Sequence, residues 1–262
     1  MKNKTNPKLR TRRILRWSRI AVQILCFLFA ASLFSQAFNG VKEVFTAMGK
    51  GEPLSWSAFV LRTLVLCGVT ILLGRIFCGW VCAFGALGDW IYQLSGALLK
   101  KTKKKLPKIP LAWIPWIQKC KYLMLFVILL LCFLGKGGWV TQNSPWTIFS
   151  LLTAGNFAIG KFPVAIVLFV LLLIGMAWEE RFFCKFFCPM GAVFSLLPEF
   201  PVFSLKRKEE QCIPNCKACK MNCPVSIKIG EDPLTEGECI RCGRCMQVCP
   251  KKNISLFPKG ER

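Results

Sequence analysis

The sequence predicts an all-α polytopic membrane domain with four transmembrane helices, followed by a small cysteine-rich domain. Three observations support this prediction. The 262-residue chain is 54% hydrophobic, it contains four long apolar stretches, and after Phe203 it becomes polar and dense in cysteine. Such a high apolar content is typical of membrane proteins. The charged run 206–210 marks the boundary, so we place the domains at residues 1–205 and 206–262.

The apolar stretches lie at residues 20–38, 58–77, 122–134 and 162–178. About 20 helical residues cross the roughly 30 Å of hydrocarbon in a bilayer, and tilt or flanking residues make up small deficits. The third stretch is short unless residues 113–117 contribute to it. The first follows a basic head and is too long for a cleaved signal peptide, so we expect it to be a retained span.

Positive charge predicts the orientation, because Lys and Arg collect in cytoplasmic loops near the ends of spans. Residues 1–19 carry eight basic side chains and residues 100–121 another eight, whereas 39–57 and 136–161 carry two each. Both ends of the chain are therefore expected in the cytoplasm, with the chain in a bacterial inner membrane. The two basic runs supply +16 of the net charge of +23 and follow the pattern of cytoplasmic loops, so no nucleic-acid partner is predicted.

A repeated motif divides the membrane domain into two pseudo-repeated halves of the same orientation. The pattern R-x-F-C-x3-C-x2-G-A begins at Arg75 and again at Arg181. On a helix, cysteines four residues apart share one face at a spacing too long for a comfortable disulfide. Two such pairs can supply four thiolates to one redox or metal site at the cytoplasmic membrane edge, namely Cys78, Cys82, Cys184 and Cys188.

The two arginines of this motif have two interpretations. Arg75 and Arg181 each precede the first cysteine by three residues, so they can lower thiol pKa values or offset the negative charge of a bound cluster. Alternatively, their side chains snorkel to the inner membrane interface. The cysteines outside any motif are expected to be small packing residues, and these are Cys26, Cys67, Cys120 and Cys132.

The cysteine-rich tail carries the most specific pattern in the chain. Cys239, Cys242, Cys245 and Cys249, followed by Pro250, form C-x2-C-x2-C-x3-C-P. This spacing lets three thiolates of one loop bind a 4Fe-4S cluster while the fourth reaches a neighbouring cluster. A second run, with one extra residue in its first gap, lies upstream. A zinc ribbon would not require these overlapping patterns, and the absence of histidine excludes bis-His haem and mixed Cys/His zinc sites.

Together the two runs resemble a bacterial two-cluster ferredoxin, which implies a small α+β fold for the tail. The resemblance also implies the ligand sets. One cluster is held by Cys212, Cys216, Cys219 and Cys249, and the other by Cys239, Cys242, Cys245 and Cys223. A domain of about 55 residues buries little apolar surface, so we expect the clusters to supply much of its folding energy.

The whole chain resembles the NapH-type membrane ferredoxins, which are membrane components of quinol dehydrogenases, and is similar to the C-terminal parts of NosR-type and FixG/CcoG-type proteins. The resemblance extends from the basic head through both C-x3-C motifs to the double run in the tail. Those families commonly have proline after the second cysteine of each membrane motif, whereas here Ala83 follows Cys82. In some relatives the resemblance implies quinol as the electron donor.

We therefore predict an electron-transfer protein that connects a quinol or an extracytoplasmic redox partner to a cytoplasmic one. Expected partners are the lipid bilayer, redox proteins such as a reductase or a flavin-carrying subunit, and the quinone pool. A third thiolate-bound centre and a quinone are additional cofactors that this interpretation allows. No catalytic residue is assigned, and whether the chain is an enzyme stays open.

Two other functions are compatible with the residues. The membrane thiols suit Cu(I), so a copper or iron reductase or assembly factor is the first alternative. A membrane-bound redox regulator is the second, although it would need an output domain that the sequence does not contain.

Overall fold

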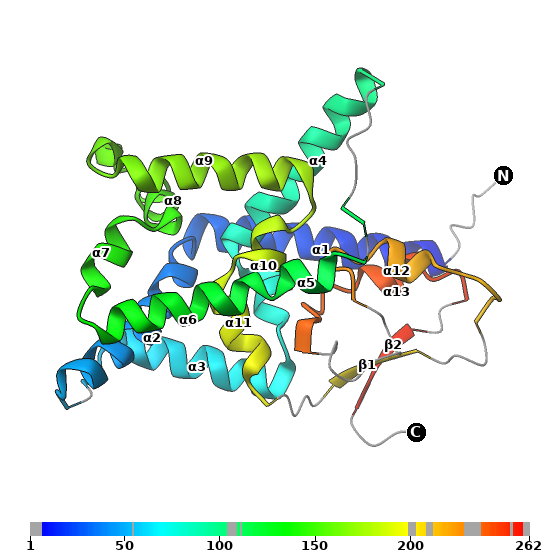
Figure 1. Ribbon diagram of the computed structural model, residues 1–262. Coiled ribbons are helices and arrows are strands. Elements are labelled where there is room, and N and C mark those ends of the chain that lie inside the picture. Colours follow the sequence, from blue (N-terminus) through cyan, green and yellow to red (C-terminus); the bar gives the residue numbers. More distant parts are fainter. Residues whose placement is uncertain are drawn as a thin grey trace.

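The computed structural model describes residues 7–53, 55–103, 109–110, 112–198, 203–207, 212–227, 237–251 and 254–258. The first six residues of the basic head, part of the second basic run at 104–108 and the boundary residues 208–210 lie outside the described residues. The described part is mostly helical, as the apolar content predicts, with one two-stranded sheet near its C-terminal end (Figure 1).

The elements follow one another in a simple order. The helices are α1 (Pro7–Phe29), α2 (Leu33–Lys50), α3 (Ala58–Leu73), the π-helix η1 (Phe77–Val81), α4 (Ala83–Lys101), α5 (Ile114–Gln118), α6 (Cys120–Phe133), α7 (Gly137–Gln142), α8 (Pro145–Thr153), the 3-10 helix η2 (Ala158–Lys161), α9 (Pro163–Trp178), α10 (Phe182–Phe186), α11 (Pro189–Leu196), α12 (Ala218–Met221) and α13 (Arg244–Val248). The strands are β1 (Phe203–Arg207) and β2 (Ile254–Pro258).

Among the described residues, one helix is long and apolar enough to cross a membrane. It covers Ile114–Phe133, with a mean hydropathy of 1.7, so α5 extends the short third stretch as expected. The first stretch is not one straight helix, because α1 and α2 meet at a bend of 64° and pass the same test only as a pair. The apolar helices α3 and α9 have 16 residues each.

The core lies between the two halves of the membrane domain and is largely aromatic. Phe84, in the first half, packs against Phe183, in the second, with ring centroids 4.6 Å apart. Phe34 of α2 contacts both rings, stacked on Phe84 at 6.1 Å and edge-on to Phe183 at 5.9 Å. All three side chains are buried. Offset and edge-on aromatic contacts of this kind hold the halves together around the repeated motifs.

A close contact fixes α2 against α3. Gly40 allows it, because a Cβ at this position would lie 2.4 Å from the carbonyl oxygen of Phe59. The hydroxyl of Thr63 then donates to the carbonyl of Ala37 at 2.5 Å. Small residues at helix crossings let backbones approach in this way, as is common for helices in membranes.

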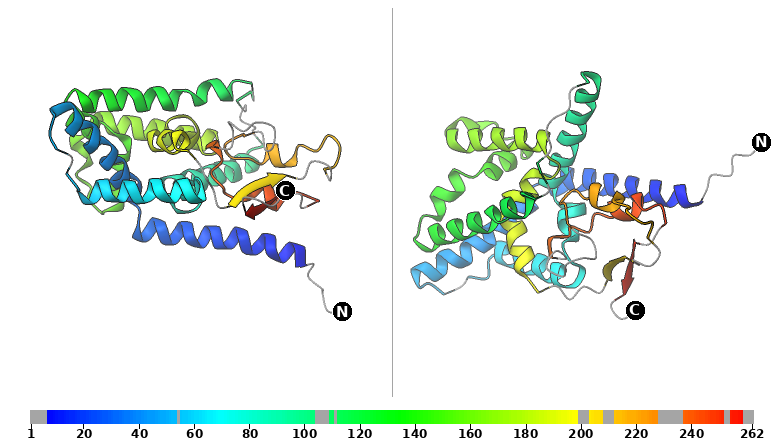
Figure 2. Two further views of the ribbon diagram at one scale, coloured as in Figure 1. Left: turned by 90° about the horizontal axis from the view of Figure 1, so that it is seen from below. Right: turned by 45° about the vertical axis from the view of Figure 1, so that its right-hand side comes forward.

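The cysteine-rich tail lies at one end of the helical part, beside α1 (Figures 1 and 2). Its strands pair antiparallel, with Leu205 opposite Leu256 and Arg207 opposite Ile254. The short helices α12 and α13 follow β1 and precede β2 in the sequence, and they contact each other. The expected boundary between residues 205 and 206 falls inside β1, so this strand spans the two parts as we divided them.

Candidate functional site

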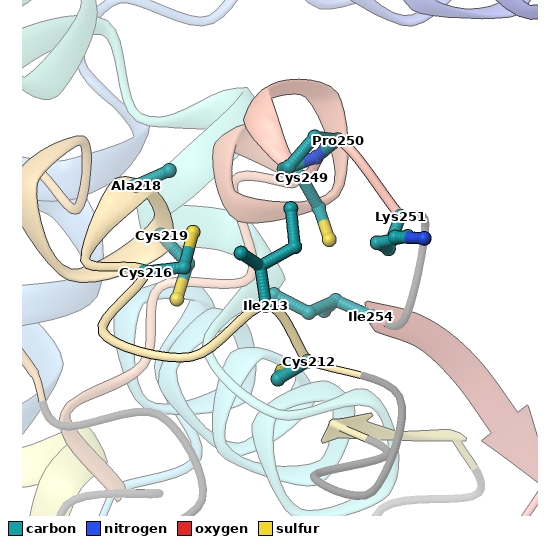
Figure 3. Close-up of a pocket in the computed structure, with 9 residues that line it drawn as sticks. All are labelled: Cys212, Ile213, Cys216, Ala218, Cys219, Cys249, Pro250, Lys251 and Ile254. Carbon is teal, nitrogen blue, oxygen red and sulfur yellow. The ribbon is translucent and has the colours of Figure 1, made fainter.

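The first candidate site is a cavity in the tail that is lined by four cysteines. Cys216 and Cys219 come from the segment around α12, and Cys249 enters from across the cavity, after α13 (Figure 3). Cys212 completes the set, and Ile213 and Ile254 supply apolar lining. The four thiols are those that the ferredoxin resemblance assigns to one cluster.

The second candidate site is a cavity that is lined by the other four tail cysteines. Cys239 and Cys242 come from one loop, Cys245 lies in the first turn of α13, and Cys223 joins them from the upstream run. Gly243 lies in this loop with φ of +72°, a conformation that glycine adopts without strain and that directs the chain into α13. Each cavity therefore collects thiols from both cysteine runs.

Burial disfavours free thiolates in the second cavity. Burial raises the pKa of Cys239 and of Cys245 to about 12, and it also raises the pKa of Cys223. These thiols therefore keep their protons unless bound cations stabilise the thiolates. Among the described residues, both linings are rich in sulfur and apolar side chains and contain no carboxylate. This donor set fits an iron-sulfur cluster, which binds through cysteine thiolates.

The membrane cysteines occupy equivalent places in the two halves. Cys78 lies in the π-helix η1 and Cys184 in α10, while Cys82 and Cys188 cap the following helices, α4 and α11. The two caps have nearly the same backbone angles, −61° and 111° for Cys82 and −73° and 109° for Cys188. The chain leaves the helix at the second cysteine of each pair, so the geometry of two cysteines on one continuous helix does not apply to either pair.

Backbone N–H groups point at these capping sulfurs. The amide of Gly85 donates to Cys82 Sγ at 3.4 Å, and the amide of Gly191 donates to Cys188 Sγ at 3.1 Å. The four sulfurs are all buried and lie close enough to interact electrostatically. Ala83 and Pro189 occupy the same first position of the next helix, so Ala83 preserves the local geometry that proline favours.

The two motif arginines cross between the halves. Arg181, from the second half, donates to the carbonyl of Cys78 at 2.6 Å and lies against Gly85, where a Cβ would be 2.2 Å from its Nη1. Arg75, from the first half, lies against Gly191, where a Cβ would be 3.0 Å from its Nη2. Both arginines are 1% exposed. The snorkelling interpretation is therefore wrong, and both guanidinium groups face the buried thiols.

Two carboxylates that the sequence analysis did not single out balance these charges. Asp89 accepts two hydrogen bonds from Arg181, at 2.7 and 2.6 Å, and one from Arg19 at 2.5 Å. Glu238 accepts a hydrogen bond from Arg75 at 3.1 Å and also forms a salt bridge with Lys121. Asp89 is one of two aspartates in the chain. An acidic residue within an apolar region was the sequence feature that could have identified it as a functional residue.

Glu238 links the membrane part to the second tail cavity, since it directly precedes Cys239. The hydroxyl of Tyr122 donates to Glu238 at 2.7 Å, in addition to the contacts of Arg75 and Lys121. Burial opposes ionisation of Glu238, but the two cations outweigh it and hold the pKa of this carboxyl below its usual value. The carboxylate is thus a fixed anchor for the loop that carries Cys239.

Among the described residues, no three His, Cys, Asp or Glu side chains are arranged to hold a single metal ion.

Known families match both parts of the chain. Residues 54–105 and 162–208 match a family described as a 4Fe-4S binding domain, and residues 233–255 match a second family of the same description. The first match covers both membrane motifs. The chain is also similar to curated proteins over most of its length, whereas no solved structure matches it.

Three relatives illustrate this similarity. An uncharacterised protein of Methanocaldococcus jannaschii is 32% identical over 243 residues, which are 93% of this chain and 94% of the relative. The putative electron transport protein YccM of Escherichia coli is 27% identical over 213 residues, or 78% of this chain and 57% of YccM. The ferredoxin-type protein NapH of Escherichia coli is 25% identical over 192 residues, or 70% of this chain and 61% of NapH.

The cysteine cavities and these matches define an iron-sulfur protein of electron transport. The chain belongs to the NapH-type family of membrane ferredoxins.

Proposed function

We propose that the chain is a membrane-bound relay between a quinol or an extracytoplasmic redox partner and a cytoplasmic partner. The observation that carries this proposal is the pair of tail cavities, each lined by four cysteines from both runs. Cys212, Cys216, Cys219 and Cys249 would hold one 4Fe-4S cluster, and Cys223, Cys239, Cys242 and Cys245 the other. Each bound cluster supplies reversible one-electron chemistry.

The protein side of this function is to bury, orient and electrically balance the thiolates. Cys242, Cys245 and Cys249 are each 8% exposed, so little water reaches them. Burial of this kind influences the potential of an iron-sulfur site, together with hydrogen bonds to its sulfurs. No side chain is assigned a proton-transfer step, and the chain acts as an electron-transfer component of a larger system.

The membrane arrangement is also a proposal. We place the four spans in α1 and α2 together, in α3, in α5 and α6 together, and in α9, with both chain ends in the cytoplasm of a bacterium. Large apolar side chains on these helices support it, because more than half of their surface is exposed: Leu64 is 51% exposed, Phe126 64% and Leu171 57%. Exposed apolar side chains on several helices fit contact with lipid. The 16-residue helices need tilt or flanking residues to cross.

The four membrane cysteines are proposed as a third centre. Its support is the matched pair of capping sulfurs, the backbone donors that point at them and the two buried guanidinium groups. Two cations beside four thiolates reduce the net charge that the buried site must hold. A centre at this place would supply the step between the lipid phase and the tail.

Metal analysis tests the proposal directly. Protein purified without oxygen should contain about twelve iron atoms and as many sulfides per chain, and about eight if the tail alone binds clusters. Replacing Cys78 and Cys188 by serine should lower the count by one cluster, whereas Cys132→Ala, which removes a buried thiol outside the motifs, should not change it. Low-temperature EPR identifies the clusters that remain.

The outcomes separate the alternatives. Zinc in place of iron, or protein without inorganic sulfide, would overturn the relay. Copper bound through the membrane thiols beside eight tail irons would overturn the third cluster and support a metal reductase. Added quinol should reduce the tail clusters of protein in lipid vesicles, and a failure of quinol and of quinone to exchange electrons with them would exclude the quinone pool as a partner.

A further inference from the structure

We infer that the second tail cavity is the one that exchanges electrons with the membrane thiols, and that the first cavity is the terminal site for the soluble partner. This order rests on the proposed function, because it assumes that both tail cavities and the membrane thiols hold redox centres. It is determined by how the loop at 237–242 sits on the π-helix of the first membrane motif.

The π-helix η1 of the first membrane motif and the loop 237–242 touch through their backbones. Gly79 lies between Cys78 and Cys82, and a Cβ at this position would be 2.2 Å from the carbonyl oxygen of Ile240. The same Cβ would be 3.3 Å from the backbone nitrogen of Cys242. Any side chain at position 79 therefore forces the two loops apart, and glycine allows the closest approach that the backbone permits.

A hydrogen bond fixes the same contact from its other side. The indole N–H of Trp80 donates to the carbonyl of Arg241 at 3.1 Å. Trp80 lies between the two cysteines of the membrane motif, and Arg241 lies between Cys239 and Cys242. The peptide segments that separate the ligands of one site are thus bonded directly to those of the other.

Buried cations lie where the two sets of sulfurs approach each other. Arg75 interacts electrostatically with Cys78 and Cys188 and donates to the carbonyl of Gly237 at 3.0 Å. Arg19 donates to the carbonyl of Gly79 at 3.1 Å and interacts with Cys242. Two thiolate-bound centres repel each other, and positive charge between them offsets that repulsion.

Further polar contacts from the helices to the tail reach the same cavity. Gln118 donates to the carbonyl of Val225 at 3.1 Å, and Lys185 donates to Ser226 at 2.9 Å. Arg244, which lines the second cavity, pairs with Glu180. These contacts hold the second cavity against the membrane part.

The first cavity opens to the surface instead. Among its lining residues, Cys216, Pro250 and Lys251 are exposed, and the apolar side chain of Ile213 is 42% exposed. In the second cavity Ile240 is 1% and Val225 4% exposed. A soluble redox protein can approach the first site closely, whereas protein covers the second. Oxidation of one quinol to quinone would release two protons to water and two electrons. These electrons would pass one at a time through centres held by the membrane thiols, the second cavity and the first cavity, and would reduce two molecules of a soluble one-electron acceptor, or run along the same path in reverse.

Two cysteine substitutions, each of which removes one cluster, test the order of electron transfer in protein reconstituted in lipid vesicles. Cys216→Ala removes the first cluster and Cys242→Ala the second, and loss of about four irons from either variant verifies the lesion. With quinol as donor, Cys216→Ala should leave the reduction rate of the second cluster within about twofold of wild type, whereas Cys242→Ala should slow reduction of the first by about tenfold or more. The opposite pattern, or equal effects, would overturn the order.

The loop contact is tested without removing a cluster. Gly79→Ala and Gly96→Ala each add one methyl group, but at Gly96 the Cβ would meet nothing within 4 Å. Gly79→Ala should slow quinol-driven reduction of the tail by about tenfold, and Gly96→Ala by less than about twofold, with iron, sulfide and EPR unchanged in both. Trp80→Phe, which loses only the bond to Arg241, replaces Gly79→Ala if that variant loses iron.

A soluble viologen provides the internal reference, because it donates at the exposed first cavity. Its rate of reducing the first cluster should stay within about twofold of wild type in Gly79→Ala. An unchanged quinol rate in Gly79→Ala, or a viologen rate that falls equally, would overturn the inference. If quinol does not reduce wild-type protein, the same rates are measured as reoxidation by quinone. Absence of clusters or of any exchange in the wild type would instead refute the proposed function.

Discussion

Replacing Asp89 by asparagine removes one negative charge from the centre of the membrane domain and keeps the side-chain shape. The carboxylate is 1% exposed. It accepts hydrogen bonds from Arg181, at 2.7 and 2.6 Å, from Arg19 at 2.5 Å and from Gln23 at 3.1 Å. The amide of asparagine would direct an N–H group at one of these donors. Two buried guanidinium groups would then lack their counter-ion.

The structure determines the size of the effect. Arg181 and Arg19 are 1% and 6% exposed, so water does not replace the lost carboxylate. Breaking a buried ion pair by removing one partner costs about 3 to 5 kcal/mol, because the other charge stays buried. For chains of this size 1 kcal/mol corresponds to about 2 to 4 °C, so the unfolding midpoint should fall by about 6 to 20 °C.

Thermal unfolding of the detergent-solubilised holoprotein, followed by tryptophan fluorescence, measures the shift. The matched control is Glu52→Gln, the same change at an exposed carboxylate, which should leave the midpoint within about 2 °C. Adding Arg181→Met to Asp89→Asn should recover part of the loss, because one uncompensated charge disappears. A midpoint for Asp89→Asn as close to wild type as that of the control would refute the assignment of Asp89 as the counter-ion.

Three further predictions concern the tail and the helix packing. Glu238→Gln leaves the ammonium group of Lys121, which is 0% exposed, without its carboxylate. The loop that carries Cys239 then loses its anchor, so chelators should remove iron from the second cavity faster than from the wild type. An unchanged rate of iron release would contradict the anchoring role of Glu238. Complete removal of iron should raise amide hydrogen exchange across residues 212–251 while α9 stays protected, and a protected apo tail would show that it folds without clusters. Gly40→Ala should lower the free energy of unfolding by about 1 to 3 kcal/mol through overpacking. The control Gly68→Ala, where a Cβ would meet nothing within 4 Å, should not lower it. Equal midpoints of thermal unfolding for the two variants would argue against the close crossing of α2 and α3.

Several features of the site were predictable because they are local. The spacing within each cysteine run limits which thiols one short loop can present, so the two groups of four that line the cavities were predicted from the runs and their resemblance to ferredoxins. The repeat also predicted that the two membrane motifs have equivalent structures, and Cys82 and Cys188 do cap their helices alike. The extension of the third apolar stretch by residues near 113–117 was predicted from the span length that a bilayer requires.

Other features depended on groups that are distant in the sequence. The geometry given for cysteines four residues apart on a helix does not apply to the C-x3-C pairs, because a sequence pattern does not report where a backbone leaves the helix to direct an amide at sulfur. The bend between α1 and α2 was not predicted, since hydropathy continues through it. Burial of Arg75 and Arg181 was one of two open interpretations, and only their surroundings decided between them.

By itself, the sequence determined the chemical inventory of this protein: an apolar helical part, a duplicated thiol motif and two cysteine runs spaced for clusters. Only the tertiary structure decided how these parts are joined, namely that each arginine serves the opposite half, that Glu238 ties the tail to α6, and that Gly79 brings one cavity and not the other against the membrane thiols. The physical reason is that ligand spacing is a short-range property of the chain. Charge compensation in a buried site and backbone contact between loops are long-range properties that depend on the packed structure.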